Sequence, residues 1–484
     1  MEKETRTRIV CTLGPSTWEE EAVQRLLSSG MNVARLNFSH ADHNVQERVF
    51  RTVRGLSERA GLQTAIICDI QGPKIRTGKM EAPFTLRFGE EVRVTSEDVV
   101  GTSERFTIDH RGIEDELVAD DEIFINDGIV KLRVLRREGR DLVCRVRAGG
   151  LISDRKGCNI PSSSISVKMP TEKDKKDLKL IARLDPEYVA ASFVGSRRDV
   201  ERIRGALRSL GNDDIKVLSK IERPSALRDI DGIIKASDAL MVARGDLGVE
   251  IPPSDVPVAQ KEICRKCNKA GKPVIVATQM LESMTEHSRP TRAEASDVFN
   301  AVLDGADAVM LSGETSVGKH PDEAVRTMRD IVKRAESYLP YRDPDYYDSE
   351  EKRIVETIGH ACNTIVKEFK DRGYSGSIIA VTESGHTARM ISKYRPDMEM
   401  FAFTPEARTA RELSLVWGAR SVLVPELKGG TMEEMAVETI RMAASRGCLD
   451  GSDHIIMASS SRLQGTKGMY IGVIDLEGMW QEDC

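Results

Sequence analysis

Eight short, apolar, β-branched segments alternate along this chain with stretches of helical periodicity. Three of these segments lie near the N-terminus, and the other five begin only at about residue 187. They occupy residues 8–13, 31–37, 64–70, 187–194, 215–221, 239–244, 273–278 and 307–312. Short apolar strands that alternate with helices predict a parallel sheet, because parallel neighbours need a crossover connection. Eight such units are the number found in a (β/α)8 TIM barrel, so the sequence predicts an α/β fold of that kind.

The alternation stops between about residues 72 and 170, where shorter strand-like runs are separated by glycines and acidic turns. That pattern predicts an all-β domain inserted after the third barrel strand. A segment rich in Pro, Tyr and Asp follows residue 337 and resembles a linker, and a further βα series follows it. We therefore expect a (β/α)8 barrel from residues 1–72 and 170–340, an inserted β domain at 73–169, and a C-terminal α/β domain at 341–484.

Composition excludes several classes of protein. Of the 484 residues, 40% are hydrophobic and 31% are charged, which is a globular balance rather than a disordered one. No apolar run reaches the roughly 18 residues of a membrane helix, so we expect no membrane partner. The 71 basic and 77 acidic residues give a net charge of −6 without a basic block, so nucleic acid is not expected as a partner. Nine scattered cysteines fit a reducing cytoplasm.

Polar side chains stand where six of the predicted strands end, which is where barrel enzymes place their chemistry. Any one of them alone would be an ordinary cap or surface ion pair, but six strand ends converge on one face. These residues are Arg35, Asn37, Ser39 and His40 after the second strand, Asp69 on the third, Lys220 and Glu222 on the fifth, Arg244, Gly245 and Asp246 after the sixth, Thr278 on the seventh, and Ser312 and Glu314 after the eighth.

The residue types at these strand ends restrict the chemistry. Glu222 and Asp246 come from adjacent strands and could share a hard divalent cation, Mg²⁺ or Mn²⁺. Lys220 can neutralise an anionic oxygen, and Arg35 can hold a phosphate or carboxylate in a bidentate contact. Gly245 opens the backbone, so that helix-starting N–H groups could bind an anion. The combination fits phosphoryl transfer or enolate stabilisation; the alternative is a structural cluster of ion pairs.

Two other motifs favour structural interpretations. Residues 313–319 fit the GxxxxGK phosphate-loop pattern, but His320 follows where Ser or Thr would hold Mg²⁺. Cys264 and Cys267 form a CxxC within a helical stretch, with no second pair to complete a metal site. We expect an ordinary turn for the first motif and a buried helix pair for the second.

Several longer stretches of the sequence closely resemble the pyruvate kinase family. The resemblance extends almost from end to end, and its most specific stretches are ARGDLGVEIP at 243–252 and ATQMLESM at 277–284. Further matches are CTLGPST at 11–17, DIQGPKIRTG at 69–78 and SKIERP at 219–224. The resemblance implies a barrel, a mobile inserted β domain and a C-terminal α/β domain, in agreement with the periodicity.

By this resemblance the reaction transfers phosphoryl from phosphoenolpyruvate to ADP, giving pyruvate and ATP in the last step of glycolysis. Catalytic roles are implied for Lys220, Arg35, Thr278 and Arg76, and metal binding for Glu222 and Asp246. Substrate contacts are implied for Arg35, Gly245, Asp246, Thr278, Ser312 and Glu314, and nucleotide contacts for His40, Asn37 and Arg76. The resemblance also implies a homotetramer. The inserted domain would close as a lid and exclude water.

One departure from the family pattern concerns K⁺. In many members a monovalent cation sits among positions that match Asn37, Ser39, Asp69 and the carbonyl of Ile70. Those members carry Glu where this chain has Lys74. An ammonium near that pocket can supply the positive charge of the ion. We therefore expect K⁺ not to be required; the alternative is a surface-pointing Lys74 that leaves K⁺ dependence intact.

The C-terminal domain offers a second anion site. Thr382, Ser384, Gly385 and Thr387 lie between a predicted strand and helix, where hydroxyl and N–H groups could bind a phosphorylated allosteric effector. A plain helix cap is the alternative.

Two other functions remain to be weighed for the whole chain. A Mg²⁺-dependent enolate lyase or aldolase would share the carboxylates and Arg35, but it would not account for Lys220 and the inserted domain. A metabolite-sensing scaffold without turnover would be favoured by loss of Lys220, Glu222 or Asp246, and all three are present.

Overall fold

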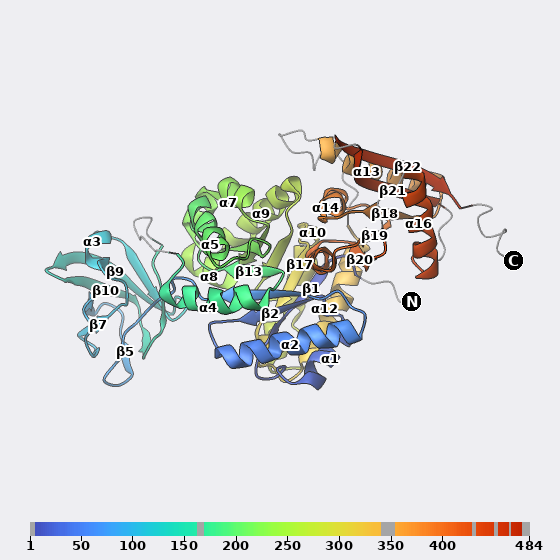
Figure 1. Cartoon of the computed structure of the whole chain (residues 1–484). Helices are drawn as coiled ribbons and strands as arrows, with labels where there is room; N and C mark the ends of the chain where they lie inside the picture. Colours follow the sequence, from blue (N-terminus) through green and yellow to red (C-terminus); the bar gives the residue numbers. More distant parts are fainter. Residues whose placement is uncertain are drawn as a thin grey trace.

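The computed structural model describes residues 5–161, 169–339, 354–427, 432–449, 454–463 and 466–476. Three bodies lie in a row, with the inserted β domain at one end, the barrel in the middle and the C-terminal domain at the other end (Figure 1). The domain limits at residues 72, 170 and 340 stay predictions, and residues 162–168 and 340–353 lie outside the described residues. Among the described residues, no helix is both long and apolar enough to cross a membrane.

The predicted eight parallel strands form a closed barrel, which confirms the fold class. Its strands are β1 (Arg8–Leu13), β2 (Val33–Asn37), β3 (Ala65–Ile70), β13 (Tyr188–Ala191), β14 (Lys216–Ile221), β15 (Ala239–Ala243), β16 (Val274–Ala277) and β17 (Ala308–Leu311). The strand β13 ends before the predicted limit, and Phe193 beyond it has a φ of 59°. The strand β16 ends at Ala277 because Thr278 and Gln279, with φ of 71° and 53°, turn the chain into the left-handed region.

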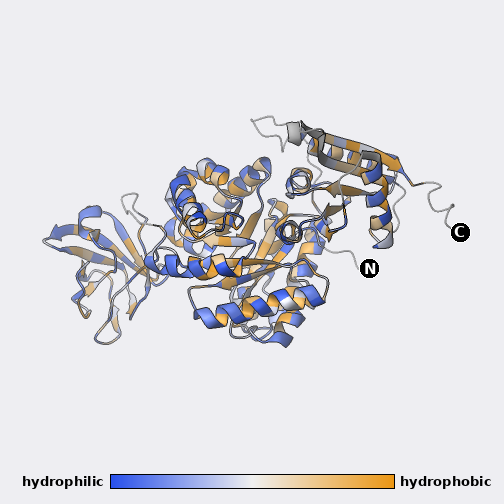
Figure 2. Cartoon of the chain, in the orientation of Figure 1, coloured by the Kyte–Doolittle hydropathy of each residue, from blue (hydrophilic) through white to orange (hydrophobic). Residues whose placement is uncertain are grey.

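Amphipathic helices surround the barrel and bury one face against its strands, as the hydropathy colouring shows (Figure 2). Three of them begin with capping boxes at Thr171, Ser196 and Thr291, where side chain and backbone satisfy each other's first-turn groups. The helices are α1 (Glu20–Ser29), α2 (His43–Arg59), α4 (Glu172–Leu184), α5 (Arg197–Ser209), α6 (Pro224–Arg228), α7 (Ile230–Ala236), α8 (Arg244–Glu250), α9 (Val256–Ala270), η1 (Glu282–Thr285), α10 (Arg292–Leu303), α11 (Gly313–Ser316) and α12 (Pro321–Glu336).

The inserted domain is all-β except for one short helix, and it has its own apolar core. A seven-stranded sheet has the order β4-β12-β8-β9-β10-β6-β7, and β11 pairs with β5. Its elements are β4 (Ile75–Arg76), β5 (Phe84–Leu86), β6 (Glu91–Thr95), β7 (Arg105–Thr107), α3 (Ile113–Glu116), β8 (Glu122–Ile125), β9 (Val130–Glu138), β10 (Asp141–Ala148), β11 (Gly150–Ile152) and β12 (Gly157–Asn159). The insertion follows β3, so the domain stands at the carboxyl ends of the barrel strands.

The C-terminal domain contains a five-stranded sheet of order β20-β19-β18-β21-β22. All its strand pairs are parallel except β21 with β22, which form an antiparallel hairpin. Its elements are α13 (Ile354–Arg372), β18 (Gly376–Val381), α14 (His386–Ser392), β19 (Glu399–Thr404), α15 (Ala407–Glu412), η3 (Leu413–Leu415), β20 (Ala419–Leu423), α16 (Met432–Ser445), β21 (His454–Leu463) and β22 (Thr466–Asp475).

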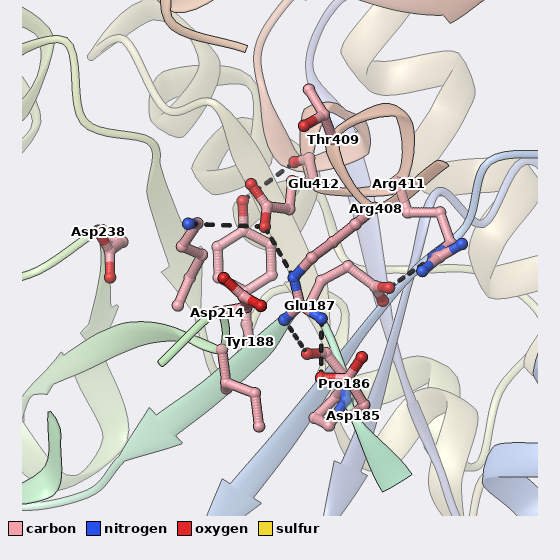
Figure 3. Close-up of polar contacts among 12 residues, drawn as sticks. Asp185, Pro186, Glu187, Tyr188, Asp214, Asp238, Arg408, Thr409, Arg411 and Glu412 are labelled. Atoms are coloured by element: carbon pink, nitrogen blue, oxygen red, sulfur yellow. Dashed lines mark hydrogen bonds and ion pairs between the residues drawn. The ribbon is translucent and has the colours of Figure 1, made fainter. Parts of the chain in front are cut away.

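This domain docks on the amino ends of the barrel strands, opposite the inserted domain. Leu415, fully buried, packs in the same apolar cluster as the residues that fill the barrel interior. Around it, Arg411 pairs with the buried Glu187 at 2.6 Å, and Arg408 pairs with Asp185 at 2.8 Å (Figure 3). The hydroxyl of Tyr188 donates to the carbonyl of Glu412 at 3.0 Å. The carboxyl ends of the barrel strands therefore stay open for chemistry.

Candidate active site

Asp69 is the centre of the polar network at the carboxyl ends of the strands. It is 1% exposed, and its carboxylate accepts from Arg35 Nε at 2.8 Å and pairs with Arg35 Nη2 at 2.7 Å. Lys220 Nζ lies 3.3 Å from Asp69 Oδ2, and Ser192 Oγ donates to Asp69 Oδ1 at 3.2 Å. Burial alone would raise the pKa of Asp69, but Lys220 and Arg35 outweigh it and lower that pKa. The carboxylate thus orients both cations toward the site.

Lys220 is buried among three polar partners. Its ammonium donates to Ser192 Oγ at 2.7 Å and lies 3.0 Å from Glu222 Oε1. Burial would lower the pKa of Lys220, yet the charges of Asp69 and Glu222 raise it, so the side chain is a cation at neutral pH. A charged ammonium held in a water-poor site is suited to stabilising a transferring anionic group.

Glu222 and Asp246 provide the carboxylates expected to bind a divalent cation. The amide of Phe193 donates to Glu222 Oε2 at 2.6 Å, while the buried Oε1 has the ion pair with Lys220 at 3.0 Å. Burial raises the pKa of Glu222 despite Lys220, and the nearby charge of Asp246 contributes to the rise. Such a pair of neighbouring oxygen donors fits a hard divalent cation, which would offset their repulsion. No cluster of three or more His, Cys, Asp or Glu side chains that could hold a metal ion occurs among the described residues.

Lys74 reaches this site from the hinge of the inserted domain. Its ammonium lies 3.2 Å from Asp246 Oδ1 and 5.8 Å from the ring centre of Phe193. The ion pair directs the ammonium toward Asp246, and the side chain is 25% exposed. Of the other residues of the predicted monovalent-cation pocket, Asn37 Oδ1 accepts from the amide of Ser39 at 3.1 Å, and Ile70 is fully buried.

Thr278 and Gly245 meet on the other side of the site. The Gly245 amide donates to Thr278 Oγ1 at 2.7 Å, at the start of α8. Arg244 fixes the loop beneath them: its Nη2 donates to the carbonyl of Thr278 at 2.7 Å, and its two Nη atoms each lie 2.7 Å from an oxygen of Asp297. The left-handed backbone of Thr278 is therefore held by a buried, charge-assisted contact.

Ser312 and Glu314 lie directly after the end of β17, and the Glu314 side chain is buried. Glu314 is fully buried and accepts from the amides of Leu281 at 2.9 Å and Ser312 at 2.7 Å. Burial raises the pKa of Glu314. The hydroxyl of Ser312 is buried and has no hydrogen-bond partner among the described residues. Glu314 thus ties two strand-end loops together, and the Ser312 hydroxyl remains available.

His40 and Arg76 flank the entrance. Burial lowers the pKa of His40, and the charges of Arg35, Arg76 and Lys74 lower it further, so these three cations stand near the imidazole. Arg76 itself donates to the carbonyl of Arg155 at 3.1 Å within the inserted domain. Its charge acts on His40, while its side chain contacts the inserted domain.

The site also contains two residues that the sequence analysis missed, Thr12 and Ser192. Arg35 Nη1 donates to Thr12 Oγ1 at 2.9 Å, and Ser192 contacts both Lys220 and Asp69. Both stand at strand ends, on β1 and after β13, and those are the two strand ends at which no polar candidate was named. The same positional rule applied to all eight strands would have found them.

Of the two motifs interpreted as structural, the CxxC is buried, and residues 313–319 contribute Glu314 to the site while Lys319 lies at the surface. Cys264 and Cys267 are fully buried on α9, and burial raises the pKa of each thiol. Residues 313–319 form the short helix α11 and a turn, and Lys319 pairs with Glu286 on the surface. In the C-terminal domain, Gly385 caps α14 with a φ of 73°, Thr382 and Thr387 are buried, and Ser384 is exposed.

The fold and this geometry together define a class of protein: a (β/α)8 enzyme with buried cationic and carboxylate side chains gathered at the carboxyl ends of its strands, beside an inserted β domain. Two family profiles match the chain, "Pyruvate kinase, barrel domain" over residues 4–325 and "Pyruvate kinase, alpha/beta domain" over residues 356–470. The chain belongs to the pyruvate kinase family, and it is a phosphotransferase.

Similar proteins match this chain along almost its whole length. A pyruvate kinase of Staphylococcus haemolyticus is 41% identical over 94% of this chain and 77% of its own length. One of Corynebacterium efficiens is 42% identical over 89% of this chain and 90% of its own. Among solved structures, a pyruvate kinase from Cryptosporidium parvum superposes with a TM-score of 0.89 at 34% identity, covering 97% of this chain and 96% of its own.

Proposed function

We propose that this site transfers phosphoryl from phosphoenolpyruvate to ADP, with Lys220 as the residue that stabilises the transferring group. The observation that supports this most is the buried ammonium of Lys220, which is held between Asp69, Ser192 and Glu222 beside the guanidinium of Arg35. Two fixed cations in one water-poor site suit a transition state that spreads negative charge over phosphoryl oxygens.

The other candidate residues have the following roles in binding the substrate and the nucleotide. Arg35, aligned by Asp69 and Thr12, holds the phosphate. The amides of Gly245 and Asp246 bind the substrate carboxylate; for this, the Thr278 hydroxyl gives up its bond from Gly245 and turns to the face where the enolate is protonated. Ser312 and Glu314 line that face, and His40, Asn37 and Arg76 contact the nucleotide.

We propose Mg²⁺ or Mn²⁺ at Glu222 and Asp246, where it supplies Lewis-acid neutralisation of charge on the bound oxygens. K⁺ is not required in this proposal, because Lys74 brings a fixed positive charge to Asp246. The chain acts in the cytoplasm as a homotetramer, and residues 382–387 bind a phosphorylated effector. The exposure of Ser384 and the left-handed turn at Gly385 support that last point.

The test is pyruvate release from phosphoenolpyruvate, ADP and Mg²⁺, first in K⁺-free buffer and then with K⁺ added. We expect full activity without K⁺, and we expect Lys74→Glu to create a K⁺ requirement. Activity of the unaltered chain only with K⁺ would remove the role given to Lys74. Lys220→Ala should abolish phosphoryl transfer while Mn²⁺ still binds, and unchanged turnover in that variant would overturn the assignment.

A further inference from the structure

Two polar contacts join the inserted domain to helix α8, one near each end of that helix. The ammonium of Lys74 lies 3.2 Å from Asp246 Oδ1 in the first turn of α8. At the last residue of α8, Asn159 Nδ2 donates to Glu250 Oε1 at 3.0 Å. Asp246 and Glu250 are four positions apart, so their side chains lie on one face of the helix. The inserted domain therefore contacts α8 at two points that are about one turn apart.

Both contacts come from one edge of the sheet in the inserted domain. Asn159 is the last residue of β12, and β12 pairs with β4, which begins directly after Lys74. A Cβ built on Gly157 of β12 would lie 3.2 Å from Lys74 Cε, so this strand closely backs the stem of the lysine. A shift of β12 along α8 therefore also shifts Lys74 relative to Asp246.

The contact between Asn159 and Glu250 is the more buried of the two. Asn159 is 3% exposed and Glu250 is 8% exposed, whereas Lys74 and Asp246 are partly exposed. A hydrogen bond to a carboxylate that is shielded from water stabilises more than a partly exposed ion pair does, and its loss leaves the carboxylate without a donor. The joint therefore depends mainly on Asn159.

Glu250 has little else to hold it. Its Oε2 is buried and has no hydrogen-bond partner among the described residues, and burial raises the pKa of the carboxyl group. The guanidinium of Arg223, just before α6, acts on Glu250 electrostatically, but the two side chains form no salt bridge in the part of the chain that the structure describes. Among those residues, Asn159 is the one hydrogen-bond donor to Glu250.

Apolar packing leaves this joint partly open. A cavity of about 360 Å³ lies beside the contact, between Phe124 and Lys131 of the inserted domain and Val249 and Pro252 of the barrel. Val249 does reach the inserted domain, because a Cβ built on Gly128 would lie 3.5 Å from Val249 Cγ1. The side chains around a cavity lack packing partners on one side, so the directional polar contacts decide how the two domains are oriented.

We propose that Glu250 is a positioning residue: its hydrogen bond from Asn159 fixes the orientation of the inserted domain on α8 and so holds Lys74 against Asp246. Glu250 acts through these residues and not by contact with the reacting groups. In its effect on turnover the inference rests on the function proposed above, whereas the contact between the two domains is testable without substrate.

Hydrogen–deuterium exchange of the full-length chain tests that contact. Asn159→Ala should speed amide exchange in α8 and β12 by about fivefold or more, because Glu250 loses its donor. The matched control is Ser96→Ala, which removes a 3.0 Å hydrogen bond to the buried Glu114 inside the inserted domain. It should change exchange in α8 by less than about twofold, since that bond does not reach the barrel.

A swapped pair gives a second test that retains a polar contact at the joint. Asn159→Asp alone places two carboxylates against each other and should speed exchange in α8. Asn159→Asp/Glu250→Gln again sets an amide against a carboxylate and should return exchange in α8 to within about twofold of the unaltered chain. This comparison holds even where Asn159→Ala does not fold.

Pyruvate release measures the consequence for the reaction. Asn159→Ala should lower kcat by about fivefold or more, and the swapped pair should recover most of that loss. Lys74→Ala should lower kcat less in the Asn159→Ala background than in the unaltered chain, because the lysine is already displaced there. A residue that only supports the fold would not show this coupling.

Three results would overturn the proposal. They are equal exchange in α8 for Asn159→Ala and Ser96→Ala, no recovery of slow exchange in the swapped pair, and independent effects of Asn159→Ala and Lys74→Ala on kcat. If the unaltered chain released no pyruvate, the function proposed above would fail, while the exchange measurements would still decide whether Asn159 and Glu250 orient the inserted domain.

Discussion

Arg244 is expected to act as a positioning residue for Thr278, and its removal tests how far catalysis depends on that loop. The side chain is 10% exposed and makes a bidentate pair with Asp297. It also donates to the carbonyls of Thr278 at 2.7 Å and of Ala277 at 3.3 Å. The loop it holds is strained, because Thr278 has a φ of 71° and non-glycine residues in that region cost about 1–2 kcal/mol.

The magnitude follows from the acceptors left behind in Arg244→Ala. Two backbone carbonyls lose a charged donor, and each loss costs about 1–3 kcal/mol when water cannot replace it fully. We expect the free energy of unfolding to fall by about 2–4 kcal/mol. If about half of that loss appears as misplacement of the Thr278 hydroxyl, kcat falls by roughly five- to thirtyfold.

The assay separates kcat and KM for phosphoenolpyruvate and adds exchange of the methyl protons of pyruvate with solvent, which reports on Thr278. Arg244→Lys should recover part of kcat, because one carbonyl contact can re-form. The control is Arg197→Ala, which removes an exposed pair with Glu201 and should leave both rates unchanged. A normal proton-exchange rate in Arg244→Ala, in a variant that has lost the expected stability, would refute the positioning role.

Three further predictions concern other parts of the molecule. Gly72→Ala should destabilise the chain by about 1–3 kcal/mol, since the residue has a φ of 65° and its Cβ would lie 2.6 Å from the carbonyl oxygen of Ser192. Denaturant titration checks this, with Gly55→Ala as a control because a Cβ there meets nothing within 4 Å. Leu415→Ala should lower unfolding stability by about 2–5 kcal/mol through a cavity at the base of the barrel, and a normal melting temperature would contradict that packing. Burial and neighbouring cations lower the pKa of His40 below its ordinary value of 6.5 in the folded chain. The unfolded chain therefore binds a proton at His40 more readily, and His40 lowers the stability of the fold as pH falls below about 6.5. His40→Gln should flatten the stability profile there, and an unchanged slope would show that another group is responsible.

The barrel and much of its site could be predicted because both depend on local patterns. A buried β-branched run such as residues 64–70 is a strand in any fully covered parallel sheet, and Asp69 near its carboxyl end must then face the open end of the barrel. The same rule brings Lys220 and Glu222 to Asp69 without knowledge of any distance. The rule requires only the number of strands and the end of the barrel at which each strand finishes.

Contacts between distant segments could not be predicted in this way. The pair of Lys74 with Asp246 joins residues 172 positions apart and depends on how the inserted domain is oriented on its hinge. The docking of Leu415 into the base of the barrel is equally hidden, because an apolar residue beside Ser414 and Val416 is compatible with any buried helix end. Such contacts are decided by shape complementarity between finished domains, which periodicity does not encode.

The barrel strands connect the docking end of the molecule to the chemical end over a short distance. On β1, Arg8 contacts the C-terminal domain and Thr12 accepts from Arg35 in the active site. The two positions are four apart along the strand, which is a distance of about 13 Å. Likewise, Tyr188 on β13 contacts the C-terminal domain, and Ser192 just after β13 accepts from Lys220 at the opposite end of the barrel. Because a barrel interior is close-packed, a substitution that displaces Arg8 should also displace Thr12 and weaken the alignment of Arg35.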